Sequence, residues 1–448
     1  MILFHGKILP DKELDRIMEG LQDFCIRAVE EQKLSAAKVI EACDVLSDRI
    51  RDGVYDEILQ PLLEKGVFTE HQLEEAVTFF CRENLEYKYR TELGSLYRYP
   101  DVQNSSGRTL GKMECQTENP GDLQPPGYSG TVRRRLMPLG VLFHIAAGNA
   151  EGLPFYSVIE GLLMGNVNIL KLPSADDGLS ALLLQELMKI NPDLVPYLTV
   201  FDIPSTNLEM LQKVGEMADA IVVWGGDEAI RAARSLAGAG TQIISWGHKL
   251  SFAYAVSDAP EEELRRLASH ICVTNQLLCS SCQGIFADTE DMEAVELLGR
   301  RFLAVLEEEG RRYPQLHLGI RGKVGISLYN EELEAPVSRR KILRGKGVSV
   351  ILAQDHTLEL SYMFRNCWVK PLPRKEIVKA LKPYRGYLQT VGLICPRTDR
   401  AYLEEQLFKA GVVRITDAGG MSDMVAGGGH DGEYPLRRYS RIVEVYKQ

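Results

Sequence analysis

The feature that most constrains the fold is a regular alternation of apolar runs and helical patterns across residues 138–245. The stretches between the apolar runs place apolar residues at helical spacing. Near-continuous apolar strands that alternate with helices form a parallel sheet that is covered on both faces. We therefore predict an α/β fold built on such a sheet. The predicted strands are 139–147, 167–171, 197–201, 220–224 and 242–245.

Residues that directly follow these strands are candidates for ligand binding, because parallel sheets bind ligands at the carboxyl ends of their strands. Lys171 ends one strand, where it either contacts ribose or phosphate or only extends its ammonium group to solvent. Asn149 either offers its amide to an oxyanion or caps a helix. Gly225-Gly226 joins a strand to a helix, where it either admits a phosphate to the backbone or forms a plain tight turn. The sequence has no GxGxxG fingerprint after its first strand.

The rest of the chain is less regular. Residues 11–98 show helical spacing of apolar positions, and the Gly-, Pro- and Asn-rich stretch 99–130 predicts a long excursion or an arm. The second half repeats the α/β alternation more loosely and predicts a second α/β domain. Its predicted helices are 260–271, 290–312, 375–383 and 399–409, and its predicted strands are 284–287, 348–352, 390–394, 411–415 and 440–446.

One thiol stands in a loop of unusual composition. Cys279 lies between the predicted helix 260–271 and strand 284–287, and its neighbours include Asn275, Gln276, Ser280 and Ser281. A loop thiol can reach a cleft, and its thiolate is a strong nucleophile. The alternative is a small buried hydrophobic residue, as most cysteines without disulfides are.

Cys282 makes a CxxC pair with Cys279, which is also the pattern of a redox dithiol or of half a zinc site. No second pair or spaced His/Cys set follows in the sequence, so we do not expect a metal.

The bulk properties exclude several classes of protein. A net charge of −10 over 448 residues argues against nucleic acid as a main partner. The nine scattered cysteines fit a reducing compartment better than a disulfide framework. Neither a secretory signal nor a membrane span is evident, so we expect a cytoplasmic protein.

Taken together and in this order, these residues resemble the aldehyde dehydrogenase superfamily. Within it they are most similar to the acyl-CoA reductases of the bacterial bioluminescence fatty acid reductase type, the LuxC family. The resemblance runs from about Met137 to the C-terminus, and it includes the Gly-His-Asp-Gly stretch at 429–432 with residues 439–443 after it. It implies a parallel-sheet nucleotide-binding domain, an α/β catalytic domain, a helical N-terminal lead-in and an oligomerisation arm.

The resemblance assigns the reacting groups. Cys279, which follows the Asn275-Gln276 pair, matches the family nucleophile, and Asn149 matches the asparagine of the oxyanion hole. Hydrolytic aldehyde dehydrogenases carry a glutamate that activates water, but Ser245 takes its place here. A thioester on Cys279 is therefore expected to survive until it meets hydride or a thiol.

The resemblance also implies a nicotinamide cofactor. Lys171 matches the lysine that contacts the adenosine ribose, and Gly225-Gly226 matches the turn that caps the pyrophosphate. Ser174 stands where NAD-preferring members often carry a glutamate, which favours NADPH. Ala147-Gly148 completes the expected cofactor contacts. The contact to the nicotinamide ribose has no confident match, although Glu359 lies in the right region.

The expected function is NADPH-dependent reduction of a fatty acyl thioester, acyl-CoA or acyl-protein, to the aldehyde. The alternatives are a CoA-acylating aldehyde dehydrogenase working in the oxidative direction, a relative of γ-glutamyl-phosphate reductase, a cofactor-free cysteine acyltransferase or thioesterase, and a non-catalytic assembly subunit. The resemblance further implies an acyl-protein synthetase partner and a homo-oligomer.

The expected domains follow from these assignments. They are a helical N-terminal segment that is part of the cofactor domain (1–108), an arm (109–136), the nucleotide-binding domain (137–249), the catalytic domain (250–432) and a C-terminal strand that returns to the arm (433–448).

Overall fold

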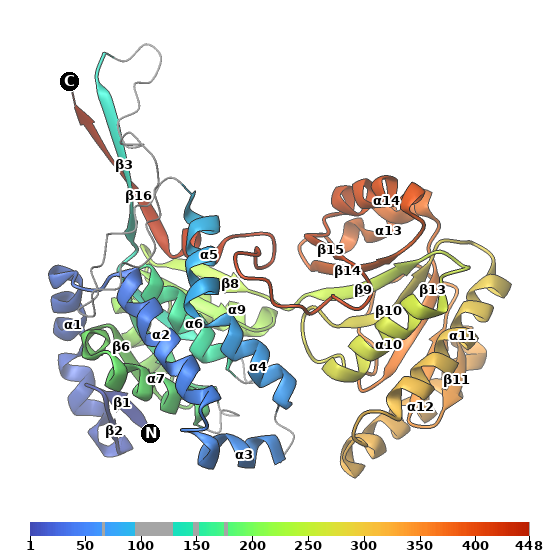
Figure 1. The fold of residues 1–448 in the computed structure, drawn as a ribbon, viewed down its shortest axis with the longest axis horizontal. Helices are drawn as coiled ribbons and strands as arrows, with labels where there is room; N and C mark the ends of the chain where they lie inside the picture. Colours follow the sequence, from blue (N-terminus) through green and yellow to red (C-terminus); the bar gives the residue numbers. More distant parts are fainter. Residues whose placement is uncertain (65–67, 95–128, 147–151, 174–177, 448) are drawn as a thin grey trace. The chain divides into compact units, whose positions relative to one another are not determined.

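The computed structural model describes residues 1–64, 68–94, 129–146, 152–173 and 178–447. The chain divides into two compact units (Figure 1). The first unit contains Met1–Gly247 together with Met424–Gln448, and the second contains His248–Asp423. Each unit has its own sheet, so the two are described separately.

Within the described residues, the first unit holds a seven-stranded sheet in the order β2-β1-β6-β5-β4-β7-β8. Strands β4 to β8 run parallel, as their apolar runs predict. The strands are β1 (Ile2–Phe4), β2 (Lys7–Leu9), β4 (Val141–Ile145), β5 (Val167–Lys171), β6 (Leu198–Phe201), β7 (Ala220–Trp224) and β8 (Gln242–Trp246).

The sheet is mixed rather than wholly parallel, because the first residues of the chain add a hairpin that the sequence analysis did not predict. Ile2 pairs with Phe201 in an antiparallel ladder, and β2 turns back along β1. Each of these strands has three residues, which is too short for a period-2 pattern to stand out.

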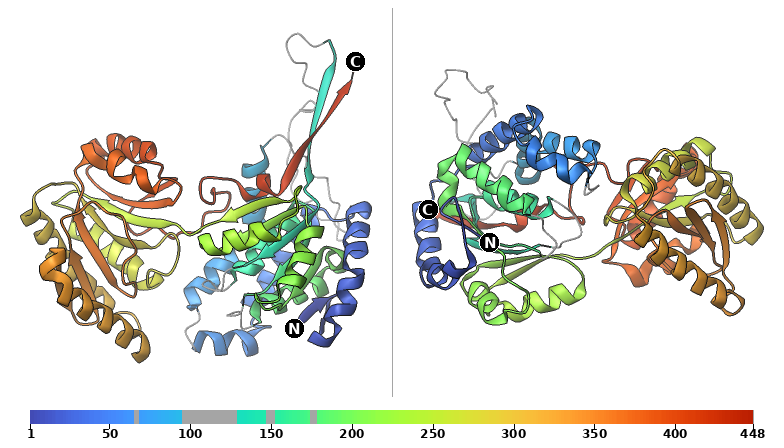
Figure 2. Two further views of the ribbon diagram at one scale, coloured as in Figure 1. Left: turned by 180° about the vertical axis from the view of Figure 1, so that it is seen from behind. Right: turned by 90° about the horizontal axis from the view of Figure 1, so that it is seen from below.

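Helices cover both faces of this sheet (Figure 2). The helical lead-in predicted for residues 11–98 is confirmed over its described part as α1 to α5, while residues 65–67 and 95–98 lie outside the described residues. The helices of the first unit are α1 (Leu14–Glu31), α2 (Ala36–Arg51), α3 (Asp56–Glu64), α4 (Glu70–Phe79), α5 (Arg82–Leu93), α6 (Leu153–Leu163), α7 (Leu179–Ile190), α8 (Leu208–Met217), α9 (Asp227–Leu236) and α15 (Pro435–Arg438).

The described part of the second unit holds another seven-stranded sheet, in the order β11-β12-β13-β10-β9-β14-β15. Only β11 is antiparallel to its neighbour. Its strands are β9 (Leu250–Ala255), β10 (Cys282–Ala287), β11 (Lys341–Gly345), β12 (Val348–Leu352), β13 (Asn366–Pro371), β14 (Leu388–Ile394) and β15 (Arg414–Thr416). Its helices are α10 (Glu261–Thr274), α11 (Met292–Gly310), α12 (Leu318–Ser338), α13 (Ile377–Leu381) and α14 (Arg397–Ala410).

The second unit differs from the prediction in several places. Strands β9, β11 and β13 were not predicted. Helix α12 was not predicted either, because most apolar residues of α12 face solvent rather than a core. The strand expected at 411–415 begins later, since Gly411 ends α14 in the left-handed conformation (φ 107°) and the chain needs further residues to enter β15.

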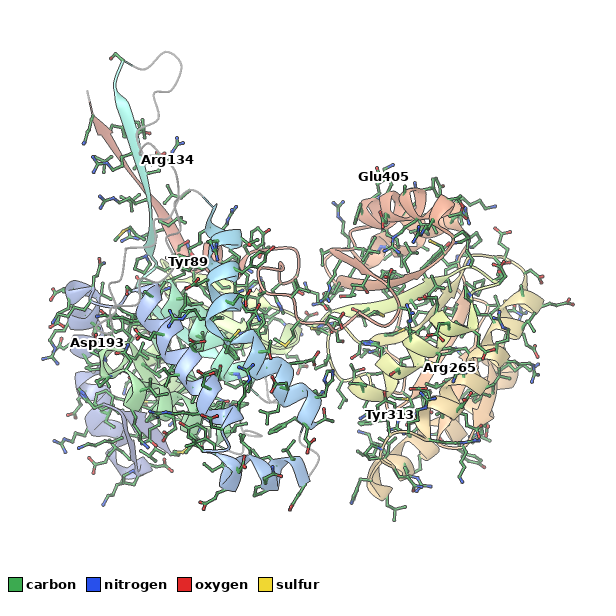
Figure 3. The ribbon with its side chains drawn as sticks, in the orientation of Figure 1. Tyr89, Arg134, Asp193, Arg265, Tyr313 and Glu405 are labelled. Carbon is green, nitrogen blue, oxygen red and sulfur yellow. The ribbon has the colours of Figure 1, made fainter. Side chains whose placement is uncertain are left out.

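A two-stranded antiparallel ribbon joins β3 (Thr131–Pro138) to β16 (Ser440–Lys447). Arg134 extends from β3 (Figure 3) and forms an ion pair of 2.6 Å with Glu444 on β16. Most of the segment expected to form an arm, 109–136, lies outside the described residues.

The C-terminal residues 424–447 are tied to the first unit by buried polar contacts. The backbone N–H of Leu436 donates to the Glu92 carboxylate at 2.9 Å, and Trp246 Nε1 donates to the hydroxyl of Tyr439 at 3.2 Å. None of the helices in the described ranges is both long and apolar enough to cross a lipid bilayer.

A buried histidine in the first unit makes stability depend on pH. His144 on β4 is fully buried between Ser157 Oγ (2.7 Å) and Asn168 Oδ1 (3.0 Å). Burial lowers its pKa from 6.5 to about 4, with the Asn168 contact opposing that shift. Between these values the unfolded chain binds one more proton than the folded chain. The free energy of unfolding therefore falls as pH drops from 6.5 towards 4, and it levels off above 6.5.

We expect this histidine to make unfolding about 2 kcal/mol easier at pH 5 than at pH 7. His144→Gln should remove that share of the pH dependence. The measurement is urea unfolding at both pH values. Only the difference between the two proteins is compared, because His270 in the second unit titrates in the same range. An equal pH dependence in both proteins would contradict the assignment.

Candidate functional site

The loop that carries Cys279 begins with an unusual helix end. Helix α10 stops at Thr274, and the next two residues, Asn275 (φ 46°) and Gln276 (φ 63°), adopt the left-handed conformation. Asparagine tolerates this region, whereas glutamine enters it at a cost of about 1 kcal/mol. The turn sends the chain away from the helix axis, so Cys279 becomes exposed before β10 begins.

A second strained segment packs beneath the first. Met363, Phe364 and Arg365 have φ angles of 58°, 50° and 70°. The Phe364 N–H donates to the Asn275 carbonyl at 3.0 Å. Consecutive residues in this region persist only where their surroundings over-determine them, and such segments cluster at functional sites.

Two buried glutamine side chains hold these strained segments in place. Gln276 is 1% exposed, and its amide oxygen accepts the N–H groups of Arg365 (3.0 Å) and Asn366 (3.2 Å). Its amide nitrogen donates to the Cys282 carbonyl and to Ser361 Oγ, each at 3.0 Å.

Gln283, 3% exposed, completes this arrangement from β10. Its amide oxygen accepts Ser361 N–H at 3.1 Å and Ser361 Oγ–H at 2.8 Å, while its nitrogen donates to the Gln276 carbonyl at 3.2 Å. The loop before β10 and the loop before β13 are thus joined through side-chain amides.

Cys279 itself is held at two atoms. Its carbonyl accepts the hydroxyl of Ser251 at 2.7 Å, and Gln389 Nε2 donates to its sulfur at 3.4 Å. β14 carries one extra residue between Leu388 and Val391 relative to β9. A bulge re-aims a side chain next to an active site. An amide donor directed at sulfur favours the thiolate.

A cation lies in the same region. Arg414 on β15 donates to the carbonyls of Gly420 (3.3 Å) and Asp423 (2.8 Å). Burial lowers the pKa of this guanidinium, while the Asp423 carboxylate and the Cys279 sulfur oppose the shift. Positive charge near a thiol favours its nucleophilic form.

Cys282 is not a loop residue, contrary to the strand boundary expected at 284. It is the first residue of β10 and is fully buried, and its thiol donates to the Gly284 carbonyl at 3.2 Å. Burial raises its pKa to about 12. The CxxC pair therefore consists of one exposed and one buried thiol.

The first unit presents a different kind of site. Along its sheet the chain proceeds from β4 through β5 to β6 on one side, then crosses to β7 and β8 on the other. Ligands of open α/β sheets bind at the carboxyl ends of the strands where the order reverses, here β4 and β7. Ala147, Gly148 and Asn149 follow β4, and Gly225-Gly226 follows β7. Ala147, Gly148, Asn149 and Ser174 lie outside the described residues.

The described residues at this edge suit a nucleotide in part. Gly225 has φ 151°, and a Cβ there would come within 3.0 Å of the Ala229 side chain, so the close turn requires glycine. It leads into the N-terminus of α9, whose first turn carries Asp227 and Glu228. These carboxylates weaken the attraction of that helix end for a phosphate.

Lys171 ends β5 and is 7% exposed. Its ammonium group donates to the Leu172 carbonyl at 3.0 Å. Burial lowers its pKa, and the nearby Asp202 carboxylate opposes that shift. The strand thus ends in a largely buried lysine at the carboxyl edge of the sheet, where the sequence analysis expected it.

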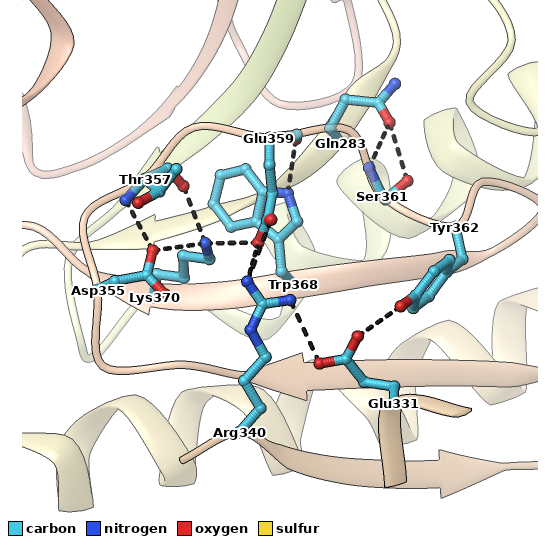
Figure 4. Close-up of polar contacts among 10 residues, drawn as sticks. All are labelled: Gln283, Glu331, Arg340, Asp355, Thr357, Glu359, Ser361, Tyr362, Trp368 and Lys370. Atoms are coloured by element: carbon cyan, nitrogen blue, oxygen red, sulfur yellow. Dashed lines mark hydrogen bonds and ion pairs between the residues drawn. The ribbon is translucent and has the colours of Figure 1, made fainter. Parts of the chain in front are cut away.

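Glu359 is engaged within the second unit (Figure 4). Its carboxylate accepts Arg340 at 2.9 Å and the fully buried Lys370 at 2.6 Å. Lys370 also contacts Asp355 at 2.8 Å. This network fixes the loop between β12 and β13, and it gives Glu359 a structural role.

A comparison with protein families decides what kind of chain this is. The family described as Acyl-CoA reductase (LuxC) matches residues 112–442, well over half of the sequence. The chain belongs to this family.

The curated relatives that this chain matches carry a consistent name. The chain is 25% identical over 322 residues to the long-chain acyl-protein thioester reductase of Aliivibrio fischeri. It is 26% identical over 327 residues to long-chain acyl-protein thioester reductase 2 of Photobacterium leiognathi. Each comparison covers 69% of this chain, and the chain spans 64% of the length of these relatives.

Solved structures confirm the predicted fold class. Lactaldehyde dehydrogenase from Escherichia coli superposes with a TM-score of 0.65 at 16% identity, over 95% of this chain and 91% of that one. A NAD-dependent benzaldehyde dehydrogenase from Corynebacterium glutamicum superposes with a TM-score of 0.67 at 12% identity, over 97% and 90%. The chain has an aldehyde dehydrogenase-like fold.

The sequence analysis missed the residues that support Cys279. Gln283, Ser251, Gln389 and Arg414 contact its loop or lie near it, yet they come from other strands. A weak signal existed, since Gln389 is a polar residue near the start of a strand that is mostly apolar. The direction of its side chain depends on the bulge, which no local pattern reveals.

We expect Cys279 to be the thiol of the CxxC pair that reacts with iodoacetamide at neutral pH. Only about one in 100,000 Cys282 thiols is ionised at pH 7 when the pKa is about 12, so Cys282 should stay unmodified. Peptide mass spectrometry after brief labelling measures both, with Cys279→Ser as the control. Preferential labelling of Cys282 would contradict this structure of the loop.

The contact from Gln389 gives a second expectation. Gln389→Leu removes the amide donor while nearly preserving volume, and it should slow alkylation of Cys279 about tenfold at pH 7. Gln389→Glu is the matched variant, which replaces the donor by a negative charge and should slow the reaction further. The measurement is the second-order rate constant of labelling, with circular dichroism to verify folding. Unchanged rates in both variants would show that the contact does not act on the thiolate.

Proposed function

We propose that this protein reduces a fatty acyl thioester to the aldehyde through a thioester on Cys279, with NADPH as the reductant. The observation that carries the proposal is an exposed thiol on a rigidly supported loop, with an amide donor at its sulfur and a guanidinium nearby. Membership of the acyl-CoA reductase family and the names of the relatives support the same chemistry.

The protein's own groups account for acyl transfer to the enzyme. The Cys279 thiolate attacks the acyl carbonyl, a carbon–sulfur bond forms, and the donor's thiol leaves with a proton. The Gln389 amide and the Arg414 charge hold the thiolate before the attack and again when it is released.

The oxyanion that forms in each tetrahedral species needs hydrogen-bond donors. The resemblance assigns the Asn149 amide and the backbone N–H of Cys279 to this role. Preorganised donors of this kind are usually the largest single contribution to acyl-transfer catalysis.

The carboxyl edge of the first sheet is the proposed cofactor site. Lys171 and the Gly225-Gly226 turn would hold the nucleotide there, together with Ala147-Gly148 and Ser174. The topological reversal beside β4 supports this location. When bound, a reduced nicotinamide would supply hydride to the acyl carbon, and Cys279 would leave as the thiolate when the aldehyde is released.

The preference for NADPH rests on residue 174. A glutamate there would repel a 2′-phosphate, and this chain carries serine. The acids at the start of α9 oppose phosphate binding but do not discriminate between the two cofactors, because both contain the same pyrophosphate.

Ser245 bears on the fate of the thioester. It lies in β8, half-buried, where it pairs with Val223 in the parallel ladder. A serine hydroxyl is a poor base at neutral pH, so it does not activate water as a carboxylate would. Release as aldehyde is therefore favoured over hydrolysis to the acid.

Two thioester donors share the required chemistry. The names of the relatives favour a protein-bound acyl group, and the family description favours acyl-CoA. We propose the protein-bound donor, delivered by an acyl-protein synthetase, with acyl-CoA as a second donor that reacts at the same carbonyl.

The test combines acyl labelling with cofactor oxidation. With a radioactive long-chain acyl-CoA, the native protein should acquire label and oxidise NADPH, whereas Cys279→Ala should do neither. Cys282→Ala is the matched control and should keep both activities within about threefold, since a buried thiol contributes packing alone. Labelling without NADPH or NADH oxidation would indicate an acyltransferase. Full activity in Cys279→Ala would refute the assignment of the nucleophile.

A further inference from the structure

Helix α12 in the second unit carries an exposed apolar stripe. The stripe residues recur at intervals of four, four, three, four and four, which places them along one side of the helix. Glycine occupies the second position, and a Cβ built there would meet open space. The stripe consists of Leu318 (76% exposed), Gly322, Ile326 (66%), Tyr329 (58%), Leu333 (63%) and Val337 (89%).

The opposite side of α12 is fixed to the body of the unit. Leu328 is 5% exposed in the core, and Glu331, 7% exposed, forms an ion pair with Arg340 at 3.3 Å. Tyr362 donates its hydroxyl to the same carboxylate (Figure 4). Because this face is anchored, the stripe cannot turn inward without breaking a buried ion pair.

The stripe is too long to be incidental. At 1.5 Å per residue, the rise from Leu318 to Val337 is about 28 Å. Single exposed apolar residues are common on monomers, whereas a contiguous exposed patch marks an interaction surface.

The order of residues along the stripe is self-complementary. If two copies of α12 pack antiparallel about a two-fold axis midway between Ile326 and Tyr329, each of these residues meets the other on the second copy. Leu318 then meets Val337, and Leu333 fills the space left by Gly322. The stripe offers a large residue opposite a small one where close approach needs it.

The charges beside the stripe obey the same symmetry. Lys323 and Glu334 follow one edge, and Arg321 and Glu332 follow the other; all are exposed. In an antiparallel pair, residues on one edge face residues on the same edge of the other copy. Lys323 then faces Glu334 twice, once on each side of the axis. Arg321 likewise faces Glu332, which also pairs with Arg344 of its own copy at 2.5 Å.

The charge balance also identifies the kind of partner. Helices that lie on membranes carry an excess of Lys and Arg on their polar side, whereas here each edge holds one cation and one anion. A balanced edge with opposite charges at symmetric positions fits a second copy of the same helix.

We propose that α12 is a self-association surface, on which two copies of this chain pair through antiparallel helices. Stable interfaces bury about 1,000 Å² or more, and one pair of 21-residue helices lies near that limit. The association should therefore depend on protein concentration. The proposal does not depend on the enzymatic activity and fails or stands separately from it.

The test reverses the charges of Lys323 and Glu334 and measures the dissociation constant of self-association by sedimentation equilibrium. Protein concentrations run from about 1 to 100 μM, and each tenfold change in the constant corresponds to about 1.4 kcal/mol. Lys323→Glu places like charges together twice, as does Glu334→Lys, and each should weaken association about tenfold. The double variant Lys323→Glu/Glu334→Lys restores opposite charges and should associate like the native protein. An equimolar mixture of the two single variants should also recover association, because each then faces its opposite.

Two controls separate this surface from any other. Lys379→Glu on α13, 87% exposed, makes the same change of charge away from the stripe and should have no effect. Leu333→Asp should abolish association at this surface without changing the circular dichroism spectrum.

Several outcomes would overturn the proposal. One is a native protein that stays monomeric at every concentration tested. Such a protein would overturn the proposal equally if it bound lipid vesicles through the stripe. Another is an oligomer whose mass is unaffected by Leu333→Asp and by both single charge reversals. A third is a mixture of single variants that associates no better than each alone.

Discussion

The proposed chemistry depends on a pair of buried side-chain amides. Gln276 and Gln283 are almost fully buried, and between them they bond the loop before β10 to the loop before β13. Each loop contains consecutive left-handed residues other than glycine, and neither would hold that conformation alone. Their strain is offset by hydrogen bonds that water cannot replace, because a buried amide left without partners costs more than a satisfied one returns. These buried hydrogen bonds therefore hold the loop that carries Cys279 in one conformation.

The two sheets use opposite edges. In the first unit the candidate residues follow the parallel strands, beside the reversal of strand order next to β4. In the second unit Cys279 precedes β10, and the residues around it, Ser251 and Gln389, lie at the starts of β9 and β14. The rule for parallel sheets therefore points to the proposed cofactor site but not to the loop of Cys279. Bulges in β10 and β14, on either side of β9, interrupt the ladders near that amino edge and free side chains to point at the loop.

The sequence analysis predicted elements that depend on neighbouring residues in the chain, and it missed those that depend on distant ones. Near-continuous apolar runs predicted β4 to β8 because a strand buried on both faces needs no partner to be recognised. The hairpin of β1 and β2 was missed because three-residue strands carry no period. Helix α12 was missed because its apolar residues lie on the exposed side, opposite to the pattern of a helix packed on a core. Cys279 was predicted from its neighbours in the chain, whereas Gln389 and Arg414, more than a hundred residues away, become neighbours only through the order of the strands.

The second unit is an insertion into the first, and this places a demand on the end of the chain. Residues 424–447 follow the second unit in the sequence and must rejoin the first unit to complete it. These residues bind the first unit through the Glu92 carboxylate, which accepts a hydrogen bond from the Leu436 N–H. The same carboxylate forms an ion pair with the buried Lys88. Lys88 also contacts Glu160 at 2.9 Å.

Burying two carboxylates with one ammonium group is expensive, and apolar residues of equal volume would pack there at lower cost. The ionic group instead makes the binding position of the returning segment specific. A carboxylate that requires one particular N–H fixes where the returning segment binds, and the same segment then sets the register of β16 against β3. An apolar patch would hold the segment equally well in several positions, so the charge trades stability for a single placement of the C-terminal strand.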